Sequence, residues 1–459
     1  MNEHGAVNSR IVSLGGFSLL FAYILSFLFE GRVLYSVMEF YGVQEGSLVL
    51  SAIVAHFAGL FTCGFFVSSL RRAKQVVLIG MAVSFICTLP FYFKPSALWF
   101  VSLVIAGYSS ALAVASWGYF LKTFTPKKQR IKTCADVLIY SNIIMILVNM
   151  SAVHISHTVG LTFSLACIAA GAVLIRKLPS DVQEKRCCEA GGTKKPMLIL
   201  FLFVFVITIN SGLMYEVMNP AFGHLTTLTS WYWAVPYIAA LAVMRNLPGR
   251  IKRYVILYVG MATIIASFIC FMLLGRGVVD YLIVNTLMLG ACGIFDLFWW
   301  SIIGEMLDYT DNPVKMFGMN LSANVLGVLC GGALGMFITS AGLADSEIAV
   351  IALTVVCITL AMLPILNRML VMKLKSHAYL VEEDYVTEPA QVQEISVFEP
   401  LTAREQEVLE LILTGISNRA IADSLNISES TVKTHARSIF SKYNVNTRAE
   451  LISLLLKSR

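Results

Sequence analysis

The sequence predicts an all-α protein in two parts: a polytopic bundle of twelve membrane-spanning helices over residues 1–375, and a small domain of four short helices over residues 399–459. Composition is the first observation behind this prediction, because the chain is 57% hydrophobic and only 14% charged. Hydropathy patterning is the second, because apolar runs long enough to cross a hydrocarbon core recur through the first part. In the second part, capping residues and helically spaced apolar residues replace these runs.

Twelve apolar runs predict the spans, and each has about the 20 residues that a helix needs to cross a bilayer. Their approximate bounds are 11–29, 47–69, 76–93, 97–121, 135–153, 158–176, 197–217, 227–245, 254–274, 279–303, 316–340 and 346–372. The connection between the fifth and sixth runs, His154 to His157, is short, so these two are the least clearly separated.

The distribution of Lys and Arg predicts the orientation of the bundle. With twelve spans, successive connections alternate between the two sides of the membrane. One side holds clusters of basic residues, and the other holds little beyond Arg32, Lys94 and Arg276. Because basic connections stay in the cytoplasm, the clusters mark the cytoplasmic side. We therefore expect a multi-pass protein of the cell (inner or plasma) membrane with both termini in the cytoplasm.

The longest cytoplasmic connection, about 178–196, divides the spans into six and six. This 6+6 organisation resembles the major facilitator superfamily, whose signature after the second span reads Gly-x-Leu-x-Asp-Arg-x-Gly-Arg-Arg. Here Gly64 is followed by Ser68 and Ser69 at the positions of Asp and Arg, and Asn246 occupies the acid's position after the eighth span. In that family the acid helps to lock and unlock the two halves, so its absence argues against active transport.

The resemblance implies that spans 1, 4, 7 and 10 line a central cavity. Ionisable residues within spans are costly and therefore indicate function, and an aromatic cavity with a few polar groups is typical of a small-molecule site. The candidate ligand-sensing residues are Glu30, Arg32, Asn210, Glu216, Asp296 and Trp299. Other residues expected on these cavity-lining spans are Tyr23, Tyr108, Trp117, Tyr215 and Trp300.

These candidates have simpler alternatives. Glu30 and Glu216 lie near the outer ends of their helices, where a carboxylate reaches water. Trp299 and Trp300 are also typical of anchors at the lipid interface. Asp296 lies in the middle of its span, and its candidate partners are a ligand cation, a proton or Arg32. The alternative is that Asp296 only solvates a seam between helices.

Residues 376–398 differ from both parts, because they are acidic and contain few apolar side chains. Such a composition predicts a flexible linker. It would separate the membrane domain, 1–375, from the C-terminal domain, 399–459.

Capping signals divide the C-terminal domain into four helices. The predicted capping boxes are Thr402 with Glu405 and Thr447 with Glu450, the predicted N-caps are Ser417 and Ser428, and the predicted stop of the first helix is Gly415. Four short helices need one shared core. Its expected members are Val408, Leu409, Ile412, Ile421, Ala422, Leu425, Ile427, Val432, Ile439, Val445 and Leu451.

The third of these helices, about Glu429 to Tyr443, has an apolar and a polar face at helical spacing. The apolar face comprises Val432, Ala436, Ile439, Phe440 and Tyr443, and the polar face comprises Ser430, Lys433, Thr434, Arg437 and Ser441. The polar face is expected to carry no acid. A helix with hydrogen-bond donors on one face, packed against a preceding short helix, is typical of a major-groove reader.

The C-terminal residues closely resemble the LuxR/NarL family of helix-turn-helix regulators. The matching positions include Leu401, Thr402, Arg404, Glu405, Glu407, Val408, Leu409, Gly415, Ser417, Asn418, Ile421, Ala422, Leu425, Ser428, Thr431, Val432, Lys433, His435, Lys442, Val445 and Arg448. The resemblance implies DNA binding through the third helix and dimerisation through the last one, Arg448 to Lys457. The DNA-binding candidates are Asn418, Ser430, Thr431, Lys433, Thr434, Arg437 and Lys442, and the dimerisation candidates are Arg448, Leu451 and Leu455.

Together these patterns predict a bacterial membrane-tethered transcriptional regulator that senses a small molecule. The alternative is a functional secondary transporter with a regulatory DNA-binding tail. Expected partners are double-stranded DNA, the lipid bilayer, an unidentified small molecule and a second copy of the chain on DNA, with RNA polymerase as a further candidate. We expect no enzyme activity, no cofactor and no metal site, because the sequence has no phosphate loop, zinc spacing or catalytic triad pattern.

Overall fold

The computed structural model describes residues 3–29, 31–43, 46–180, 194–247, 253–341, 345–371, 401–413, 416–443, 445, 447–448 and 450–451. The regular elements of these residues are all helices. The chain divides into two compact units, Met1–Val381 and Glu382–Arg459. The predicted boundaries at 375, 376, 398 and 399, and the predicted linker, lie outside the described residues.

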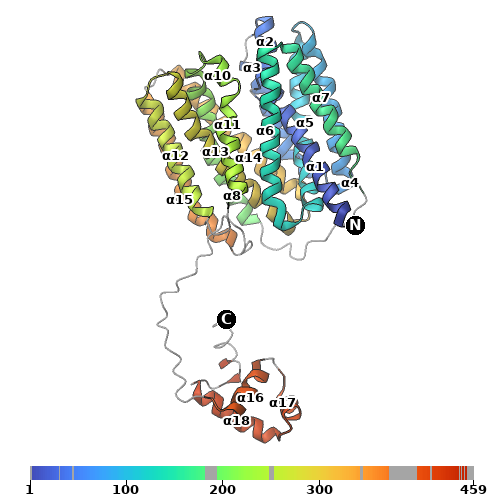
Figure 1. Ribbon diagram of the computed structural model, residues 1–459, viewed down its shortest axis with the longest axis vertical. Coiled ribbons are helices and arrows are strands. Elements are labelled where there is room, and N and C mark those ends of the chain that lie inside the picture. The colour runs from blue at the N-terminus through green and yellow to red at the C-terminus, as the bar shows by residue number, and fades with distance from the viewer. Residues whose placement is uncertain are drawn as a thin grey trace. The chain divides into compact units, whose positions relative to one another are not determined.

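The membrane unit contains fifteen α-helices in its described part, several of them extended by a short π- or 3-10 helix (Figure 1). Those of the first half are α1 Glu3–Tyr23 with η1 Ile24–Leu28, α2 Arg32–Tyr41, α3 Gly46–Phe66, α4 Leu70–Thr88 with η2 Leu89–Tyr92, α5 Ala97–Phe124, η3 Lys127–Gln129 with α6 Arg130–His154, and α7 His157–Arg176. Those of the second half are α8 Lys194–Leu213 with η4 Met214–Met218, α9 Asn219–Ala221, α10 Thr226–Thr229, η5 Tyr232–Ala234, α11 Val235–Arg245, α12 Arg253–Leu273, α13 Val278–Met306 with η6 Leu307–Tyr309, α14 Pro313–Ser340 and α15 Asp345–Val371.

Every predicted span contains a helix, and ten helices of the described residues are long and apolar enough to cross a membrane. The predicted eighth span, 227–245, is divided into α10, η5 and α11. Two features account for the division. The hydroxyl of Ser230 bonds back to the carbonyl of Thr227 at 2.7 Å, and Pro236, the second residue of α11, has no N–H to bond to the preceding turn. The last span, α15, carries Pro364 inside it.

The sequence did not predict α2, which follows the first span. Its apolar face is buried in the bundle through Val33, Leu34, Val37 and Met38. The chain reaches α2 through a sharp turn at Gly31, where an added Cβ would lie 1.8 Å from the carbonyl oxygen of Ser26. Only glycine allows so close an approach.

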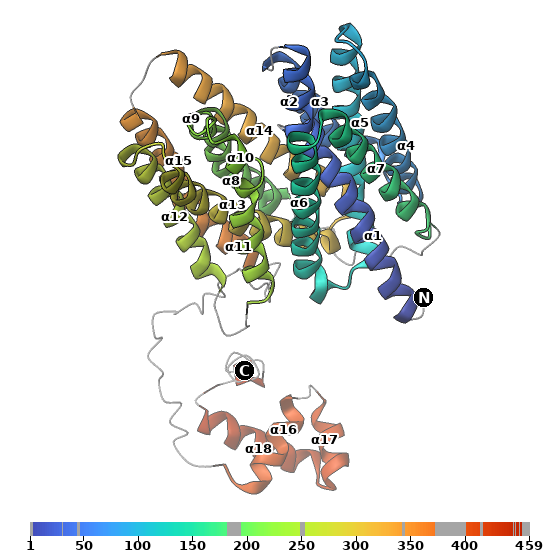
Figure 2. The ribbon, with the colours of Figure 1, turned by 45° about the horizontal axis from the view of Figure 1, so that its top comes forward.

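The helices form two groups, α1–α7 and α8–α15, as the colours of Figure 2 show. The groups meet along two seams: α14 packs against α3 and α5, and α6 packs against α11 and α13. Glycines bring some of these helices very close. A Cβ on Gly318 of α14 would lie 2.5 Å from the carbonyl oxygen of Leu60 on α3, so this seam depends on small residues, as is usual between helices in lipid.

Polar contacts close the bundle at the end where α1 begins. The guanidinium of Arg130 donates to Asp308 Oδ1 at 2.7 Å and to the carbonyl of Gly304 at 2.8 Å. Lys122 Nζ donates to the carbonyl of Thr310 at 2.8 Å. Further contacts across this end join Arg245 to Asp136 and Asn312 to the carbonyl of Gly64.

The serines that replace the acidic signature have a local role at this same end. Ser69 is the N-cap of α4 and accepts a hydrogen bond from the backbone N–H of Arg72. Ser68 Oγ accepts from the Arg72 guanidinium at 3.2 Å. The acids that form ion pairs between the two halves lie on other elements. Asp136 of α6 pairs with Arg245, and Asp308 of η6 pairs with Arg130.

The described part of the C-terminal domain comprises α16 Ala403–Leu413, α17 Asn418–Leu425 and α18 Glu429–Lys442. The predicted N-caps are confirmed, because Ser417 accepts from the N–H of Ala420 and Ser428 accepts from the N–H of Thr431. Between α17 and α18 the chain turns at Asn426, whose φ is +51°. Gly415 and most of the predicted fourth helix lie outside the described residues.

All of the apolar residues predicted for the domain's core contribute to one hydrophobic cluster. Val408, Ile421, Val432, Ile439 and Leu451 are fully buried in it. Leu425, Ile427 and Val445 are partly buried against its edge. The domain therefore has a core of its own.

Glu405 joins the first and third helices of this domain. Its Oε2 accepts from the N–H of Thr402 at 2.7 Å, as the predicted capping box requires, and from Lys442 Nζ at 2.8 Å. Its Oε1 accepts from Ser438 Oγ at 2.6 Å. These hydrogen bonds, that from Lys442 above all, lower the pKa of Glu405 to about 2.

We predict that Glu405→Gln destabilises a fragment of residues 396–459 by about 1–3 kcal/mol, because Lys442 loses its buried counter-charge. The folded pKa lies below the ordinary value of 4.5, so the wild-type carboxylate stabilises the fold above pH 4.5 and loses this effect as the pH falls toward 2. Urea unfolding followed by circular dichroism between pH 2 and pH 7 measures both effects.

Glu407→Gln is the matched control, because Glu407 forms an exposed pair with Arg404 on the same helix. Exposed pairs contribute little, so its stability should change by less than about 1 kcal/mol. Equal effects of the two substitutions would contradict the role assigned to Glu405.

Candidate DNA-binding surface and membrane cavity

The polar face of α18 is exposed where the sequence predicts it. Ser430, Lys433, Thr434 and Arg437 are all exposed, whereas Val432, Ala436 and Ile439 are buried. The buried residues pack α18 against both α16 and α17. This packing leaves the donors of α18 on one side of the helix, as groove reading requires.

The prediction that this face carries no acid is wrong. Glu429 lies one turn before Lys433, and its Oε1 is 2.8 Å from Lys433 Nζ. The hydrogen bond from Lys433 lowers the pKa of Glu429. The acid was assigned to the helix start, but a residue four positions before Lys433 shares its face.

Ser430 and Thr431 belong to the start of α18. Ser428 Oγ lies 2.6 Å from Ser430 Oγ and 2.7 Å from Thr431 Oγ1. Thr434 donates its hydroxyl to the carbonyl of Ser430 at 3.0 Å. The hydroxyl groups therefore cluster at the N-terminus of α18, where the helix dipole favours an anion such as a phosphate.

Three candidate residues have contacts inside the domain instead of free side chains. Lys442, predicted to bind DNA, forms the part-buried pair with Glu405. Asn418 accepts from the Arg448 guanidinium at 3.3 Å. Arg448, predicted at the dimer contact, also donates to the carbonyls of Ile412 and Ile416 at 3.0 and 2.7 Å, and so satisfies the end of α16.

Leu451, a second dimerisation candidate, is fully buried in the core of its own domain. Its side chain therefore packs against the other helices of the same chain. Leu455, the third candidate, lies outside the described residues.

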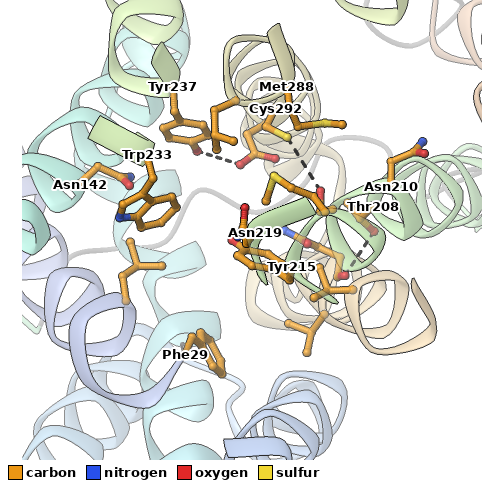
Figure 3. A pocket seen from close by; sticks show the side chains of 18 of the residues that line it. Phe29, Asn142, Thr208, Asn210, Tyr215, Asn219, Trp233, Tyr237, Met288 and Cys292 are labelled. Atoms are coloured by element: carbon orange, nitrogen blue, oxygen red, sulfur yellow. Dashed lines mark hydrogen bonds between the residues drawn. The ribbon is translucent and has the colours of Figure 1, made fainter. Parts of the chain in front are cut away.

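A cavity of about 540 Å³ lies between the two halves of the membrane unit. Among the candidates, Arg32, Asn210, Asp296 and Trp299 line it, and so do Tyr215 and Trp300. Figure 3 shows Trp233 and Tyr237 on one side of the cavity and Tyr215 and Asn219 across from them. A volume of this size holds a small organic molecule.

The π-helices η1 and η4 lie at corresponding positions, directly after the first helix of each half. Leu25 of η1 and Met214 and Tyr215 of η4 line the cavity. A π-helical turn widens the backbone and is frequent at functional sites.

Asp296 of α13 accepts two hydrogen bonds in the cavity wall. The hydroxyl of Tyr237 donates to Oδ2 at 2.7 Å, and the indole N–H of Trp299 donates to Oδ1 at 3.1 Å. Arg32, one of its predicted partners, instead donates to Thr229 Oγ1 at 3.1 Å.

The lipid-anchor alternative for the two tryptophans is wrong, because Trp299 and Trp300 are 0% and 1% exposed. Trp300 lies among Phe17, Phe21 and Trp117, with ring centroids 5.9–6.3 Å away. Both rings are therefore part of the core around the cavity.

Other expected residues lie elsewhere. Glu216 packs against α14, where a Cβ added to Gly335 would lie 2.7 Å from the Cβ of Glu216. Glu30 lies outside the described residues. Tyr23 is fully buried against Thr88, 2.7 Å from its hydroxyl. Tyr108 lies 3.0 Å from the hydroxyl of Thr62.

The sequence analysis did not predict several residues that line the cavity. Trp233 and Tyr237 belong to the divided eighth span, and the assumption that only spans 1, 4, 7 and 10 line the cavity excluded them. Asn142 and Asn149 of α6 also line it. Their spacing of seven residues, which places both amides on one helix face, was a signal that could have found them.

The two units of the chain are similar to different known proteins. Residues 399–455 match the family model described as bacterial regulatory proteins, luxR family. The monoamine regulon transcriptional regulator of Klebsiella aerogenes is 53% identical over 53 residues, 12% of this chain and 23% of that protein. The nitrate/nitrite response regulator protein NarP of Escherichia coli is 47% identical over 62 residues, 14% of this chain and 29% of that protein. The chain thus spans less than a third of either relative.

The membrane unit is similar to a solved structure instead. The crystal structure of the human organic anion transporter MFSD10 superposes with a TM-score of 0.55, over 78% of this chain and 100% of that one. The sequence identity is 14%, so this similarity shows the fold alone. The chain is therefore a multi-pass membrane protein that joins a domain of the major facilitator fold to a C-terminal DNA-binding domain of the LuxR family.

Proposed function

We propose that this protein is a membrane-tethered one-component transcriptional regulator, in which the membrane domain senses a small molecule and thereby controls sequence-specific DNA binding. One observation carries the proposal. The chain that contains a LuxR-family domain also contains a cavity of about 540 Å³, with buried polar groups, between two packed halves. A binding site and a DNA reader in one chain are the two parts that such a regulator needs.

The orientation of the chain agrees with this role. Of the basic residues that the structure describes, Arg130, Lys122 and Arg245 lie at the end of the bundle where α1 begins. By the positive-inside rule this end faces the cytoplasm. The C-terminal domain, which follows α15, is then in the compartment that holds the DNA.

The proposed mechanism uses two packings of the halves. A ligand that binds one packing better than the other shifts the equilibrium toward it. The contacts of Arg130 with Asp308 and of Arg245 with Asp136 belong to the packing described above, and another packing would break them. Because α15 ends at this same end of the bundle, its movement changes how two C-terminal domains meet.

We further propose that the active form on DNA is a dimer. The pair between Glu429 and Lys433 reduces the positive charge of the recognition face, so one domain has a weak, salt-sensitive hold on phosphates. Two domains on two half-sites supply the missing affinity. The contact would use the last helix, in which Leu455 remains a candidate.

A working transporter with a regulatory tail is the second candidate function. The ion pairs that join the halves at one end favour it, because such contacts can break and re-form as a bundle alternates. Uptake of a radiolabelled compound into proteoliposomes distinguishes the candidates. Accumulation driven by a proton or sodium gradient would support the transporter.

Lys433→Ala and Arg437→Ala should each weaken operator binding by about 1–3 kcal/mol while the domain stays folded, because each removes a long donor from the exposed face of α18. The operator is obtained by selection from random oligonucleotides with residues 396–459. Fluorescence anisotropy on this operator and on scrambled DNA, at fixed salt, measures the loss of specificity.

Glu410→Gln is the control, since Glu410 is exposed on α16. It should leave the affinity within about 0.5 kcal/mol. If both alanine variants discriminate operator from scrambled DNA as well as the wild type, α18 is not the recognition helix.

Asp296→Asn should alter the response to the signal without altering membrane insertion, because asparagine keeps the shape of the side chain and removes its charge. In a reporter strain the variant should be fixed in one output state. Membrane fractionation and immunoblotting provide the amount of inserted protein. A normal dose-response curve at wild-type protein levels would remove Asp296 from the sensing mechanism.

A further inference from the structure

The carboxylate of Asp296 lies within a membrane-spanning helix, and its hydrogen-bond partners are neutral side chains. Tyr237 and Trp299 each donate one hydrogen bond to it, at 2.7 and 3.1 Å. An indole N–H can only donate, so Oδ1 is an acceptor in this arrangement. Neutral donors orient a carboxylate but leave its net charge in place. In the described part of the chain no basic side chain forms an ion pair with Asp296.

The surroundings of this carboxylate suit an ammonium group. Tyr237, Trp299 and Trp300 all line the cavity beside it, and Phe295 precedes it on α13 and lines the cavity as well. Aromatic ring faces attract cations, and each carboxylate oxygen has a lone pair left for a further donor. A protonated amine uses both features, whereas an alcohol uses only the hydrogen bonds and an anion is repelled.

Buried amides provide an independent indication that the cavity receives an organic ligand. Asn210 is 2% exposed, and neither its Oδ1 nor its Nδ2 has a hydrogen-bond partner in the described structure. Asn149 is 1% exposed, and its Oδ1 also lacks a partner. Both residues line the cavity. Buried polar atoms are costly unless they are bonded, so these amides suit uncharged polar groups of a ligand.

Arg32, the other charged residue of the cavity wall, has a partner of its own. Arg32 contacts Thr229, and Asp296 contacts Tyr237, which follows Thr229 by eight residues along α10, η5 and α11. Arg32 and Asp296 thus have separate partners on separate elements, α10 and α11. Because the described structure shows no ion pair between the guanidinium and the carboxylate, a cation is favoured at the Asp296 side of the cavity.

From these observations we propose that the cavity binds a protonated amine carried on an aromatic or other flat apolar frame. Its ammonium group lies against Asp296, and its uncharged polar groups meet Asn210 and Asn149. This inference rests on the proposed function for the assignment of the cavity as the ligand site.

The test uses the full-length protein in lipid nanodiscs and three probes with one ring and one spacer. These are 3-phenylpropylammonium, 3-phenylpropanol and 3-phenylpropanoate at pH 7. Because Trp233, Trp299 and Trp300 line the cavity, intrinsic tryptophan fluorescence reports its occupation. The ammonium should bind about tenfold or more tightly than the alcohol, and the carboxylate should bind most weakly.

Two variants locate the selectivity. Asp296→Asn should bind the ammonium and the alcohol equally, because the charge is gone. Arg32→Gln is the matched control, since it removes the other cavity charge, and it should keep the preference for the ammonium. Asp296→Glu retains the charge and should keep part of the preference, which secures the test if the asparagine variant does not fold.

Three results would overturn the inference. One is equal affinity of the wild type for the ammonium and the alcohol, or no binding of the ammonium at millimolar concentration. Another is a preference that survives in a folded Asp296→Asn variant. The third is a fluorescence change that pH alone produces, that disappears in the Asp296→Asn variant and that the ammonium probe does not affect. Asp296 would then be a site for a proton. None of these measurements involves DNA, so they leave the regulator proposal to be decided by its own reporter experiment.

Discussion

A polar group inside a bilayer has to find its partner within the protein, and this constraint organises the membrane domain. Serine and threonine hydroxyls bond back to their own helices, as Thr208 does to the carbonyl of Val204 at 2.8 Å. Guanidinium and ammonium groups gather at one end of the bundle, where Asp308, Asp136 and backbone carbonyls receive them. Two groups that the protein does not match fully, the Asp296 carboxylate and the Asn210 amide, both line the cavity.

The same physical reasoning explains why the C-terminal domain is a separate unit. Its carboxylate at Glu405 is matched in full, by Thr402, Ser438 and Lys442, and its apolar residues share one cluster. Nothing in this network needs the membrane domain for its stability. In the proposed regulator a signal would therefore reach the DNA through the arrangement of the domains, and a change in pairing between two copies is a simple way to do so.

The sequence was sufficient where local patterns determine the structure. The caps at Ser417 and Ser428, the capping box of Thr402 with Glu405, and the buried face of α18 were all predicted, because each depends on residues within one or two turns. The twelve apolar runs predicted the helices for the same reason. The position of Asp296 inside an apolar run also identified it as unusual, since a carboxylate there is rare.

The sequence did not predict the features that depend on tertiary contacts. The division of 227–245 and the extra helix α2 depend on a turn at Gly31 and on back-bonded hydroxyls, which leave the apolar pattern unchanged. Tyr237 became a partner of Asp296 only through the folding of α11 against α13. The contacts of Lys442 and Arg448 inside the domain could not be predicted either, because they join residues that are more than 30 positions apart in the chain.

In the proposed regulator, occupation of the membrane cavity changes the affinity of the C-terminal domain for DNA. This effect is tested most directly by titrating a fluorescent operator with the full-length protein in nanodiscs, with and without 3-phenylpropylammonium at a concentration that saturates the tryptophan signal. Coupling energies between sites typically correspond to 5–150-fold, so we expect the operator Kd to change by about tenfold, while the isolated fragment 396–459 is unaffected by the probe. An unchanged operator Kd in protein whose cavity is demonstrably filled would contradict the account.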